Sequence, residues 1–322
     1  MSPTPSSLVI ASRGSRLALI QAEMVAAMVR AAAPGIEVAI RTVTTTGDRD
    51  ARPYAQIGGK GLFTSEVERE VVDGRADVAV HSAKDLTAEL ARGCDIVCVP
   101  ARASVHDVVV GGTGDTGFER LGSLAPGATV GTSSMRRRAL LADGRGDLEV
   151  VELRGNLDTR LRKVADGVVD AAILAAAGIE RLLGDVGDAA PLDPDAWVPA
   201  PAQGALAVEA LADRHDLREL FASIDDPAAH AEVTCERAFA ATLEGGCSIP
   251  LGCLARVTGS NLVANGFLAG PDGSQSLRDR ISGHVREAEA LGKELAQAIL
   301  SSGGDDLLAE LREMDAPVVE EP

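Results

Sequence analysis

Strand-like and helix-like hydrophobic patterns alternate along the N-terminal third of the chain. Short apolar or alternating runs predict strands at residues 8–11, 37–45, 77–80 and 96–99. Apolar residues at helical spacing predict a helix over 16–33, and a Ser65-x-x-Glu68 capping box predicts a second helix that ends near residue 74. This order is typical of an α/β unit with a mainly parallel sheet and helices on its faces.

The same order restarts after Pro100. Strands are predicted at 107–110, 128–130, 148–153 and within 168–175, with helices over 134–142, 156–166 and up to 183. The segment 185–201 is rich in Asp, Pro and Gly and predicts a crossover. The strand expected at 205–210 then returns to the first unit.

The C-terminal third has a different pattern. A long helix is expected over 227–243, two strands over 253–258 and 262–268, and a last helix over 287–300. Strands grouped between helices predict a small α+β domain. The predicted fold class is therefore α/β, with two α/β domains followed by a smaller C-terminal α+β domain. The expected boundaries are 1–101 with 199–217, then 102–198, then 218–322.

The composition argues against several classes of protein, including those that bind nucleic acid or span a membrane. The 322 residues are 46% hydrophobic but only 2% aromatic, so few rings are present to stack on nucleic-acid bases. The net charge of −17 also argues against nucleic acid as a partner. No secretory signal and no apolar run long enough for a transmembrane helix occur. Five cysteines without a C-x-x-C pair favour neither disulfides nor a metal site, and we expect a cytoplasmic protein.

Three motif-like patterns are weak. Gly112-x-Gly114-x-x-Gly117 matches a dinucleotide fingerprint, but Pro126-Gly127 leaves room for only about two helical turns after it. Gly58-Gly59-Lys60-Gly61 lacks the Ser or Thr that a P-loop needs, so it is interpreted as a flexible loop presenting one lysine. Ser15, His81 and Asp85 make a conceivable triad, but no G-x-S-x-G elbow supports it.

Candidate chemistry lies where predicted strands end. Lys84 and Asp85 follow the strand 77–80, and ligands of open α/β sheets gather at such strand ends. A carboxylate there is able to stabilise a cation or shuttle a proton, although such a pair is more often a surface pair.

Two further strand ends carry small polar residues and arginines. They are Gly131-Thr132-Ser133-Ser134 with Arg136, Arg137 and Arg138, and Leu153-Arg154-Gly155-Asn156 with Arg160. Helix N-termini and guanidinium groups both bind anions, so these junctions indicate a ligand with several carboxylates; the alternative is capped helices with solvated arginines. Cys247, after Gly245-Gly246, is either a reactive loop thiol or a buried small side chain.

Taken together, these segments resemble the porphobilinogen deaminase family, in the family's order and over nearly the whole chain. The matching segments are His81-Ser82-x-Lys84-Asp85, Gly58-Gly59-Lys60-Gly61-Leu62-Phe63, Gly131-Thr132-Ser133-Ser134-x-Arg136-Arg137, Leu153-Arg154-Gly155-Asn156, Gly245-Gly246-Cys247, Ala11-Ser12-Arg13-x-Ser15 and Pro199-Ala200-Pro201-Ala202-Gln203-Gly204-Ala205. Each is weak alone, whereas jointly they are highly specific.

The resemblance implies an enzyme that deaminates porphobilinogen and joins it head-to-tail into hydroxymethylbilane. It implies two lobes similar to periplasmic binding proteins, and a third domain whose Cys247 holds a dipyrromethane cofactor through a thioether. Asp85 is then the catalytic carboxylate. The cofactor would be bound by Cys247, Lys84, Asp85, Ser134, Arg136, Arg137 and Arg160. Arg13, Ser15 and Gln203 would face the substrate, Lys60 would lie in a mobile lid, and the enzyme would be a monomer without metal, nucleic-acid or membrane partners.

The chain departs from the family's usual pattern at three positions. Thr87 stands where Pro is usual, Ser248 where Gln is common, and His106 where many relatives carry Arg. Two other classes of protein remain open from the residues alone. A two-lobed polycarboxylate-binding protein would explain the sheets and arginines without Cys247, and a nucleotide-dependent oxidoreductase would use the glycine fingerprint.

Overall fold

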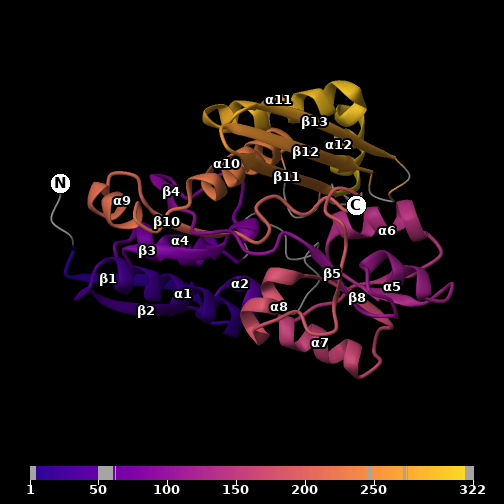
Figure 1. Cartoon of the computed structure of the whole chain (residues 1–322), viewed down its shortest axis with the longest axis horizontal. Coiled ribbons are helices and arrows are strands. Elements are labelled where there is room, and N and C mark those ends of the chain that lie inside the picture. Colours follow the sequence, from indigo (N-terminus) through magenta and orange to yellow (C-terminus); the bar gives the residue numbers. More distant parts are fainter. Residues whose placement is uncertain are drawn as a thin grey trace, which may run out of the picture.

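The computed structural model describes residues 5–49, 61, 63–244, 249–270, 273 and 275–315. These residues form three lobes, each built on its own sheet (Figure 1). Two lobes lie side by side, and the third, formed by the C-terminal part of the chain, lies above them. Within the described ranges, no helix combines the length and apolar character that crossing a membrane requires.

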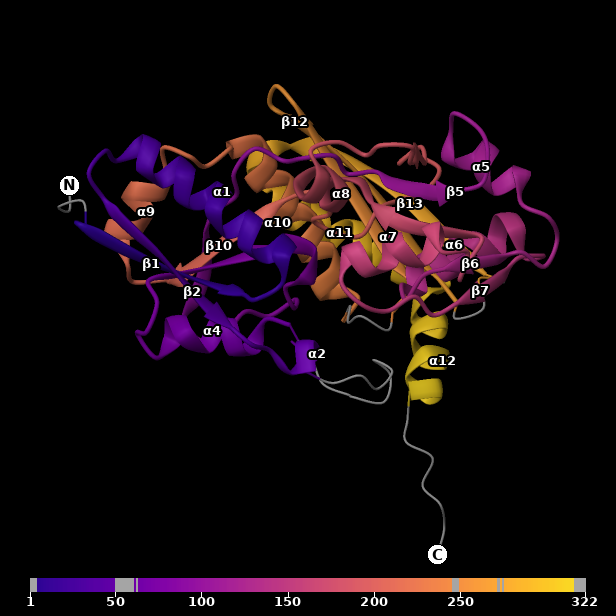
Figure 2. The ribbon, with the colours of Figure 1, turned by 90° about the horizontal axis from the view of Figure 1, so that it is seen from below.

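The first lobe has a five-stranded sheet in the order β2-β1-β3-β10-β4. Its strands are β1 (Ser7–Arg13), β2 (Glu37–Val43), β3 (Val78–Ser82), β4 (Cys94–Cys98) and β10 (Leu206–Leu211), and its helices are α1 (Arg16–Ala32), α2 (Thr46–Arg49), α4 (Ser65–Val72) and α9 (His215–Phe221). Helices α1 and α9 cover one face and α4 the other (Figure 2). The expected return of a late strand to this sheet is confirmed, since that strand is β10.

The expected mainly parallel sheet is confirmed, and two details add to the sequence-based expectation. The late strand β10 is the antiparallel member of the five-stranded sheet, since it runs against both β3 and β4. The physical reason is that β10 arrives from the second lobe and starts opposite the end of β3, with Leu206 beside Ser82. The predicted capping box is wrong: Thr64 occupies the N-cap of α4, without a side-chain capping hydrogen bond, and Ser65 is already helical.

The second lobe has a sheet in the order β7-β6-β8-β5-β9. Its strands are β5 (Asp107–Gly111), β6 (Thr129–Gly131), β7 (Glu149–Val151), β8 (Ala171–Ala175) and β9 (Ala190–Pro191), and its helices are α5 (Gly117–Ser123), α6 (Met135–Arg145), α7 (Leu157–Ala165) and α8 (Ala176–Leu183). The glycine fingerprint leads only into the seven-residue α5, capped by Thr116. The dinucleotide interpretation therefore has no crossover helix to support it.

The third lobe packs helices on one face of an antiparallel sheet, β11-β12-β13. Its elements are α10 (Pro227–Thr242), β11 (Leu251–Thr258), β12 (Asn261–Ala269), β13 (Ser276–His284), α11 (Ala288–Ile299) and α12 (Asp305–Asp315). The sequence pattern missed β13 because it is a polar edge strand with few buried residues. The other face of the sheet places Leu254 and Phe267 in the core of the second lobe.

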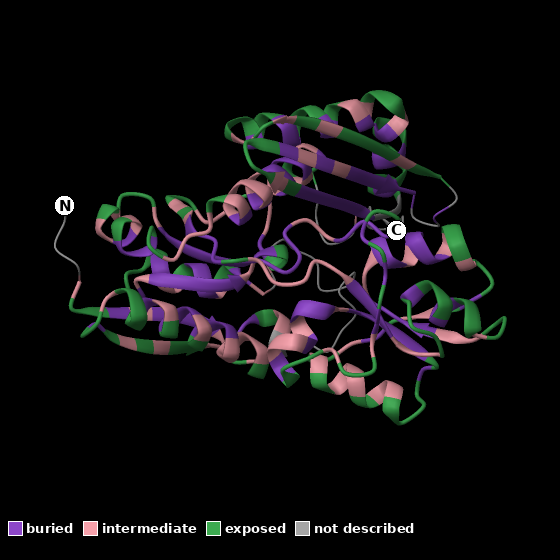
Figure 3. Ribbon diagram, viewed as in Figure 1, coloured by how far each residue is buried: buried purple, intermediate pink, exposed green. Residues whose placement is uncertain are grey.

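Burial is greatest at the centre of the two α/β sheets, in β3, β8 and β10 (Figure 3). These strands are mostly apolar because both of their faces are covered, and the exceptions His81 and Glu209 are themselves buried. The structure confirms the predicted fold class of two α/β units followed by a smaller α+β unit. The strand ends that carry the candidate site are consequently held in rigid sheets.

Candidate active site

The turn after β3 presents a cation and a carboxylate. β3 lies between β1 and β10, so its end is fixed on both sides. A single 3₁₀ turn, Ala83–Asp85, follows directly; Ala83 is buried, whereas Lys84 and Asp85 are exposed. The buried strand therefore anchors a short turn whose two charged side chains face solvent.

Asp85 lines a small pocket of about 60 Å³ together with Arg13, Ser15, Phe63 and His81. The guanidinium carbon of Arg13 lies 4.2 Å from the centroid of the Phe63 ring, a cation–π distance. Ser15 caps α1, since its Oγ accepts a hydrogen bond from the Ala18 N–H at 3.3 Å. The residues predicted to face the substrate, Arg13 and Ser15, thus lie beside the predicted catalytic carboxylate.

The same pocket brings together Ser15, His81 and Asp85, yet they do not form a nucleophilic triad. The Ser15 hydroxyl is engaged at the N-terminus of α1. The His81 Nε2 lies 3.2 Å from Oε2 of the buried Glu209, on the interior side of the sheet. A triad requires the histidine to contact the serine, and this contact is absent from the described hydrogen bonds.

Lys84 connects the turn to the second lobe. Its Nζ donates a hydrogen bond to Oε1 of Gln203 at 3.3 Å. The side chain is open to solvent, but the surrounding protein still desolvates the ammonium. This burial effect, followed by the charge of Arg137, lowers the pKa of Lys84 from its ordinary value near 10.5 to about 8. Lys84 is therefore a cation whose charge changes in a mildly alkaline range.

Gln203 differs from its predicted role. The resemblance implied that it faces the substrate, but its side chain is completely buried. Its Nε2 donates to the Val105 carbonyl at 2.8 Å and to Oδ1 of Asp107 at 2.9 Å. Because both ends of the amide are occupied within the protein, Gln203 bridges Lys84 to Asp107 rather than facing a ligand.

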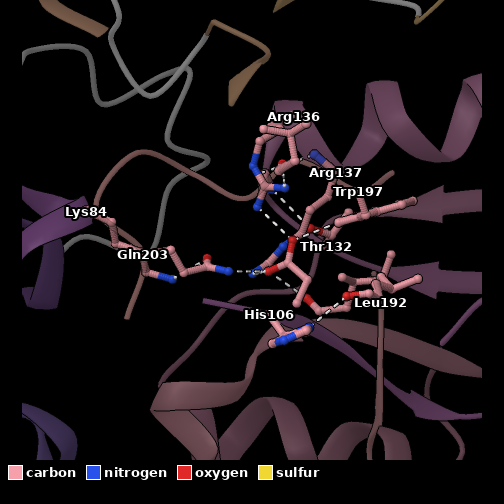
Figure 4. A network of polar contacts seen from close by, with 12 residues as sticks. Lys84, His106, Thr132, Arg136, Arg137, Leu192, Trp197 and Gln203 are labelled. Atoms are coloured by element: carbon pink, nitrogen blue, oxygen red, sulfur yellow. Dashed lines mark hydrogen bonds and ion pairs between the residues drawn. The ribbon is translucent and has the colours of Figure 1, made fainter. Parts of the chain in front are cut away.

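Asp107, at the start of β5, is the centre of a buried polar network, and Figure 4 labels its partners Arg136, Arg137, Trp197 and Gln203. Its carboxylate accepts from Arg136 at 2.8 Å, from Arg137 at 2.6 Å and from the Trp197 indole at 2.9 Å. Burial alone would raise the pKa of Asp107, but the two guanidinium charges outweigh it and hold the pKa well below its usual range. Asp107 is therefore ionised and permanently paired.

Arg136 and Arg137 make hydrogen bonds inside the protein in addition to their predicted role in cofactor binding. Arg136 and Arg137 are buried, and besides Asp107 they donate to the carbonyls of Val198 and Ile173, respectively. The Nε atom of each is buried and makes no hydrogen bond to any described residue. Each guanidinium thus uses two of its five N–H donors in hydrogen bonds within the described protein, and its buried Nε–H is among the donors that remain.

The two strand–helix junctions of the second lobe lie next to each other in one sheet. β6 and β7 are parallel neighbours, so their carboxyl ends meet at one edge. Ser134 caps α6 by accepting from the Arg137 N–H, and Arg160 donates its Nε to the Gly155 carbonyl at 2.9 Å. The Ser133 hydroxyl ties the junctions together through the Leu153 carbonyl at 2.8 Å.

Two predicted site residues, Lys60 and Cys247, lie outside the described residues, as does Ser248. Sequence reasoning missed Asp107, since a single aspartate before an apolar run carries no motif. It also missed Arg181 on α8, whose Nη2 donates to the Gly204 carbonyl at 2.7 Å while its buried Nε makes no hydrogen bond to the described chain. The one signal in the sequence was that Arg181 lies on the helix that directly follows the predicted strand within 168–175.

A larger groove of about 740 Å³ lies elsewhere, on the face of the C-terminal sheet opposite its helices. It is lined by Arg256, Arg278 and Arg280 among others, and Arg256 pairs with Asp195 at 2.6 Å. The groove contains none of the strand-end motifs, and its arginines are exposed. The smaller pocket, in contrast, is lined by Asp85 together with Arg13 and Ser15.

Comparison with solved structures found periplasmic and transport-related binding proteins. An amino acid ABC transporter substrate-binding protein from Streptococcus pneumoniae is 16% identical, with a TM-score of 0.39, over 68% of this chain and 87% of that chain. A periplasmic VFT2 domain of BvgS from Bordetella pertussis, a double mutant, is also 16% identical and has a TM-score of 0.39, over 67% of this chain and 85% of that chain.

Comparison by sequence gives much closer relatives. The porphobilinogen deaminase of Roseiflexus castenholzii is 44% identical over 94% of this chain and 99% of its own length. That of Bordetella parapertussis is also 44% identical, over 94% and 96%. The family model described as "Porphobilinogen deaminase, dipyromethane cofactor binding domain" matches residues 8–219, and the one for the C-terminal domain matches 230–301. The chain therefore belongs to the porphobilinogen deaminase family, transferases of tetrapyrrole biosynthesis that carry a dipyrromethane cofactor.

Proposed function

We propose that this chain carries out the family's reaction with Asp85 as its catalytic carboxylate. The reaction removes ammonia from porphobilinogen and joins the pyrroles head-to-tail into hydroxymethylbilane. The observation that supports the assignment is the shared pocket of Asp85, Arg13 and Ser15 at the end of a buried strand. Lys84, next to Asp85, is linked through Gln203 to the arginines of the second lobe.

The donors around this turn fit the carboxylate-bearing cofactor. Arg136 and Arg137 each have a buried Nε without a described hydrogen-bond partner, and Lys84 presents an exposed ammonium. Together with Ser134 and Arg160 at the neighbouring strand ends, they would hold the acetate and propionate groups. When bound through Cys247, dipyrromethane would supply the pyrrole carbon that begins the chain. The thioether to Cys247 is part of this proposal.

Asp85 would act on the substrate through charge and proton transfer. Loss of ammonia from the aminomethyl group leaves a cationic azafulvenium, which an adjacent carboxylate stabilises. A protonated Asp85 oxygen would first give its proton to the departing amine, and the resulting carboxylate would later take the pyrrole α-proton. Arg13 would bind a substrate carboxylate, which orients the aminomethyl carbon toward Asp85. Ser15, whose hydroxyl caps α1, would fix the wall beside it.

We further propose that the protein works in the cytoplasm as a monomer. The four described cysteines are free thiols, which suits a reducing compartment. All the proposed site residues come from one chain, and porphobilinogen is the only partner that the site requires. The net charge of −17 disfavours nucleic acid and anionic membranes as partners. Sedimentation of the purified protein at two concentrations tests the monomer.

The proposed domain division follows the three sheets. The division expected from the sequence, with 1–101 and 199–217 in the first domain, 102–198 in the second and 218–322 in the third, needs one change: the first domain would extend to residue 221, because α9 (His215–Phe221) packs as a whole into the first core. The antiparallel return of β10 to the first sheet supports the split first domain. Limited proteolysis with mass analysis would be expected to cut near these boundaries before it cuts within a sheet.

Intact-protein mass spectrometry tests the proposed function directly. The purified protein should exceed its sequence mass by one dipyrromethane, and brief exposure to porphobilinogen should add pyrrole units stepwise. Cys247→Ser should lack the increment, whereas Cys98→Ser at a buried thiol should keep it. Turnover by a protein of bare sequence mass would overturn the proposal, and an increment that persists in Cys247→Ser would place the anchor elsewhere.

A further inference from the structure

Charged side chains hold the segment that follows Asp85 from two sides. Nη2 of Arg237 donates hydrogen bonds to the carbonyl of Thr87 at 3.0 Å and to that of Ala88 at 3.2 Å. The backbone of Ala91 acts on the Glu68 carboxylate and partly offsets the effect of burial on the pKa of that group. Arg237 therefore ties the start of the segment 86–91, the backbone at its other end interacts with Glu68, and no sheet ladder holds the segment.

The two tethering side chains come from different lobes. Glu68 lies on α4 of the first lobe, and α4 begins just after the segment that contains Lys60. Arg237 lies on α10, which connects the first lobe to the third (Figure 1) and ends shortly before Cys247. The segment after Asp85 is therefore in contact with the helices that border both the predicted lid and the predicted cofactor loop.

Hydrogen bonds and nearby buried charges both act on the Arg237 guanidinium. Glu209 is completely buried, its Oε2 lies 3.2 Å from Nε2 of His81, and its charge acts on the nearby Glu68. Glu209 and Glu68 both interact favourably with the Arg237 charge. Burial, followed by the charge of Glu209, raises the pKa of Glu68. The two hydrogen bonds to the Thr87 and Ala88 carbonyls fix the position of the Arg237 guanidinium, and the charges of Glu209 and Glu68 favour its protonated form there.

We propose that Arg237 and Glu68 are positioning residues, which orient Asp85 by fixing the segment 86–91 directly behind it. This inference rests on the proposed catalytic role of Asp85. Neither residue lines the pocket that contains Asp85. Their effect therefore acts through the backbone, and it should alter the rate of the chemical step more than the binding of substrate. A displacement of about 1 Å at a catalytic group is enough to reduce turnover by about 10²-fold.

Arg237→Gln, Arg237→Lys and Glu68→Gln test the proposal in the holoenzyme. Arg237→Gln should keep the cofactor mass increment and a KM within about twofold of the original protein, while kcat falls by at least about tenfold. Arg237→Lys should recover part of kcat, because it keeps the charge but not the planar donor. Arg218→Gln, which removes an arginine that ties α9 to Asp95 on the same lobe, is the matched control and should leave kcat unchanged.

Several results would overturn the proposal. Folded Arg237→Gln with normal kcat would do so, as would a loss of activity that merely follows the unfolded fraction seen by circular dichroism. If Arg237→Gln does not fold, the test rests on the nearly isosteric Glu68→Gln. A lower kcat with an unchanged KM in this variant would support the proposal, and a normal kcat would overturn it. In the double variant the two losses should be less than multiplicative, because both act on one segment.

Different results would refute the positioning role of Arg237 and Glu68 and the catalytic role of Asp85. If Asp85→Asn keeps normal turnover, the catalytic role of Asp85 is wrong whatever Arg237 does. If Asp85→Asn is inactive while Arg237→Gln and Glu68→Gln are normal, only the positioning role is wrong.

Discussion

His106 and Thr87 depart from the family's usual residues, and each makes contacts of its own. The Nδ1 of His106 lies 3.0 Å from the Leu192 carbonyl and so ties the start of β5 to the crossover segment. Thr87 offers its carbonyl to Arg237, and its hydroxyl bonds to the Glu89 carbonyl. Neither side chain is among those that line the Asp85 pocket, so these departures change local loop contacts rather than the pocket itself.

Asp85→Asn is the direct test of a single residue. The amide keeps the shape of the side chain but neither stabilises a cation nor transfers a proton, so kcat should fall by about 10²-fold or more. Cofactor attachment, measured by intact mass, should persist. Asp73→Asn, at an exposed aspartate paired with Arg75, is the control and should keep full activity. Turnover close to normal in Asp85→Asn would remove Asp85 from the mechanism.

Single residues were predictable where they belong to motifs. Arg13, Ser15 and Asp85 fall in one pocket, as their motifs indicated. Gln203 and Asp107 were not predictable, because burial decides what their polar groups do. A glutamine in a loop motif has the same sequence signature whether it faces a ligand or spans two lobes.

At the scale of elements, the ends of β3, β5 and β6 meet through the Asp107 network. Asp107 opens β5, while Arg136 and Arg137 lie in the first turn of α6 after β6. Gln203 completes the connection from the turn after β3. The resemblance implied that these arginines bind the cofactor; in the structure both also pair with the buried carboxylate of Asp107. Their positions relative to any ligand therefore depend on Asp107.

Asp107→Asn should destabilise the protein strongly, because it leaves two buried guanidinium groups without their counter-charge. Loss of one partner from such a buried cluster costs about 3–5 kcal/mol of unfolding free energy. The lowered pKa of Asp107 means that its stabilisation is complete above the ordinary aspartate pKa of about 3.9 and fades as the pH falls below it. Urea unfolding at pH 7 should show the full difference, and the difference should shrink toward strongly acid pH.

The exposed pair Asp195–Arg256 supplies the control for that experiment. Asp195→Asn should change the urea midpoint little, since exposed ion pairs contribute little. Equal effects of Asp107→Asn and Asp195→Asn on the urea midpoint would show that the buried Asp107 network stabilises the protein no more than an exposed ion pair does.

Most elements followed from the hydrophobic pattern, and the misses have physical causes. α1, β5, α8 and α10 lie within a few residues of their predicted bounds, because their apolar faces are strongly periodic. β13 was missed because an edge strand that faces solvent needs few apolar residues. The direction of β10 was missed because pairing direction depends on where the chain re-enters the sheet.

At the scale of the whole molecule, cations gather in one place on a strongly acidic protein. The net charge is −17, yet Lys84, Arg136 and Arg137 lie close enough to influence one another's ionisation. Their mutual repulsion is part of what lowers the pKa of Lys84 to about 8. Carboxylate ligands would relieve this repulsion, which gives the region a preference for polyanions.

This arrangement predicts a pH dependence for cofactor assembly. In cofactor-free protein supplied with porphobilinogen, the assembly rate should fall as the pH rises through about 8, because Lys84 loses its positive charge there. Lys84→Arg should remove this alkaline fall, since its guanidinium stays protonated. Intact mass against time at pH 7 and pH 9 measures both rates. The same alkaline fall in Lys84→Arg would assign it to another group.

The sequence by itself determined the order of strands and helices, the family and the motif residues at the strand ends. These properties depend on local periodicity and on residue identity, which one chain carries in full. Only the tertiary structure decided that Asp107 pairs with both arginines, that Gln203 is buried, and that Arg237 holds the segment behind Asp85. Such contacts join residues distant in sequence, and their strength comes from exclusion of water, which is a property of the folded interior alone.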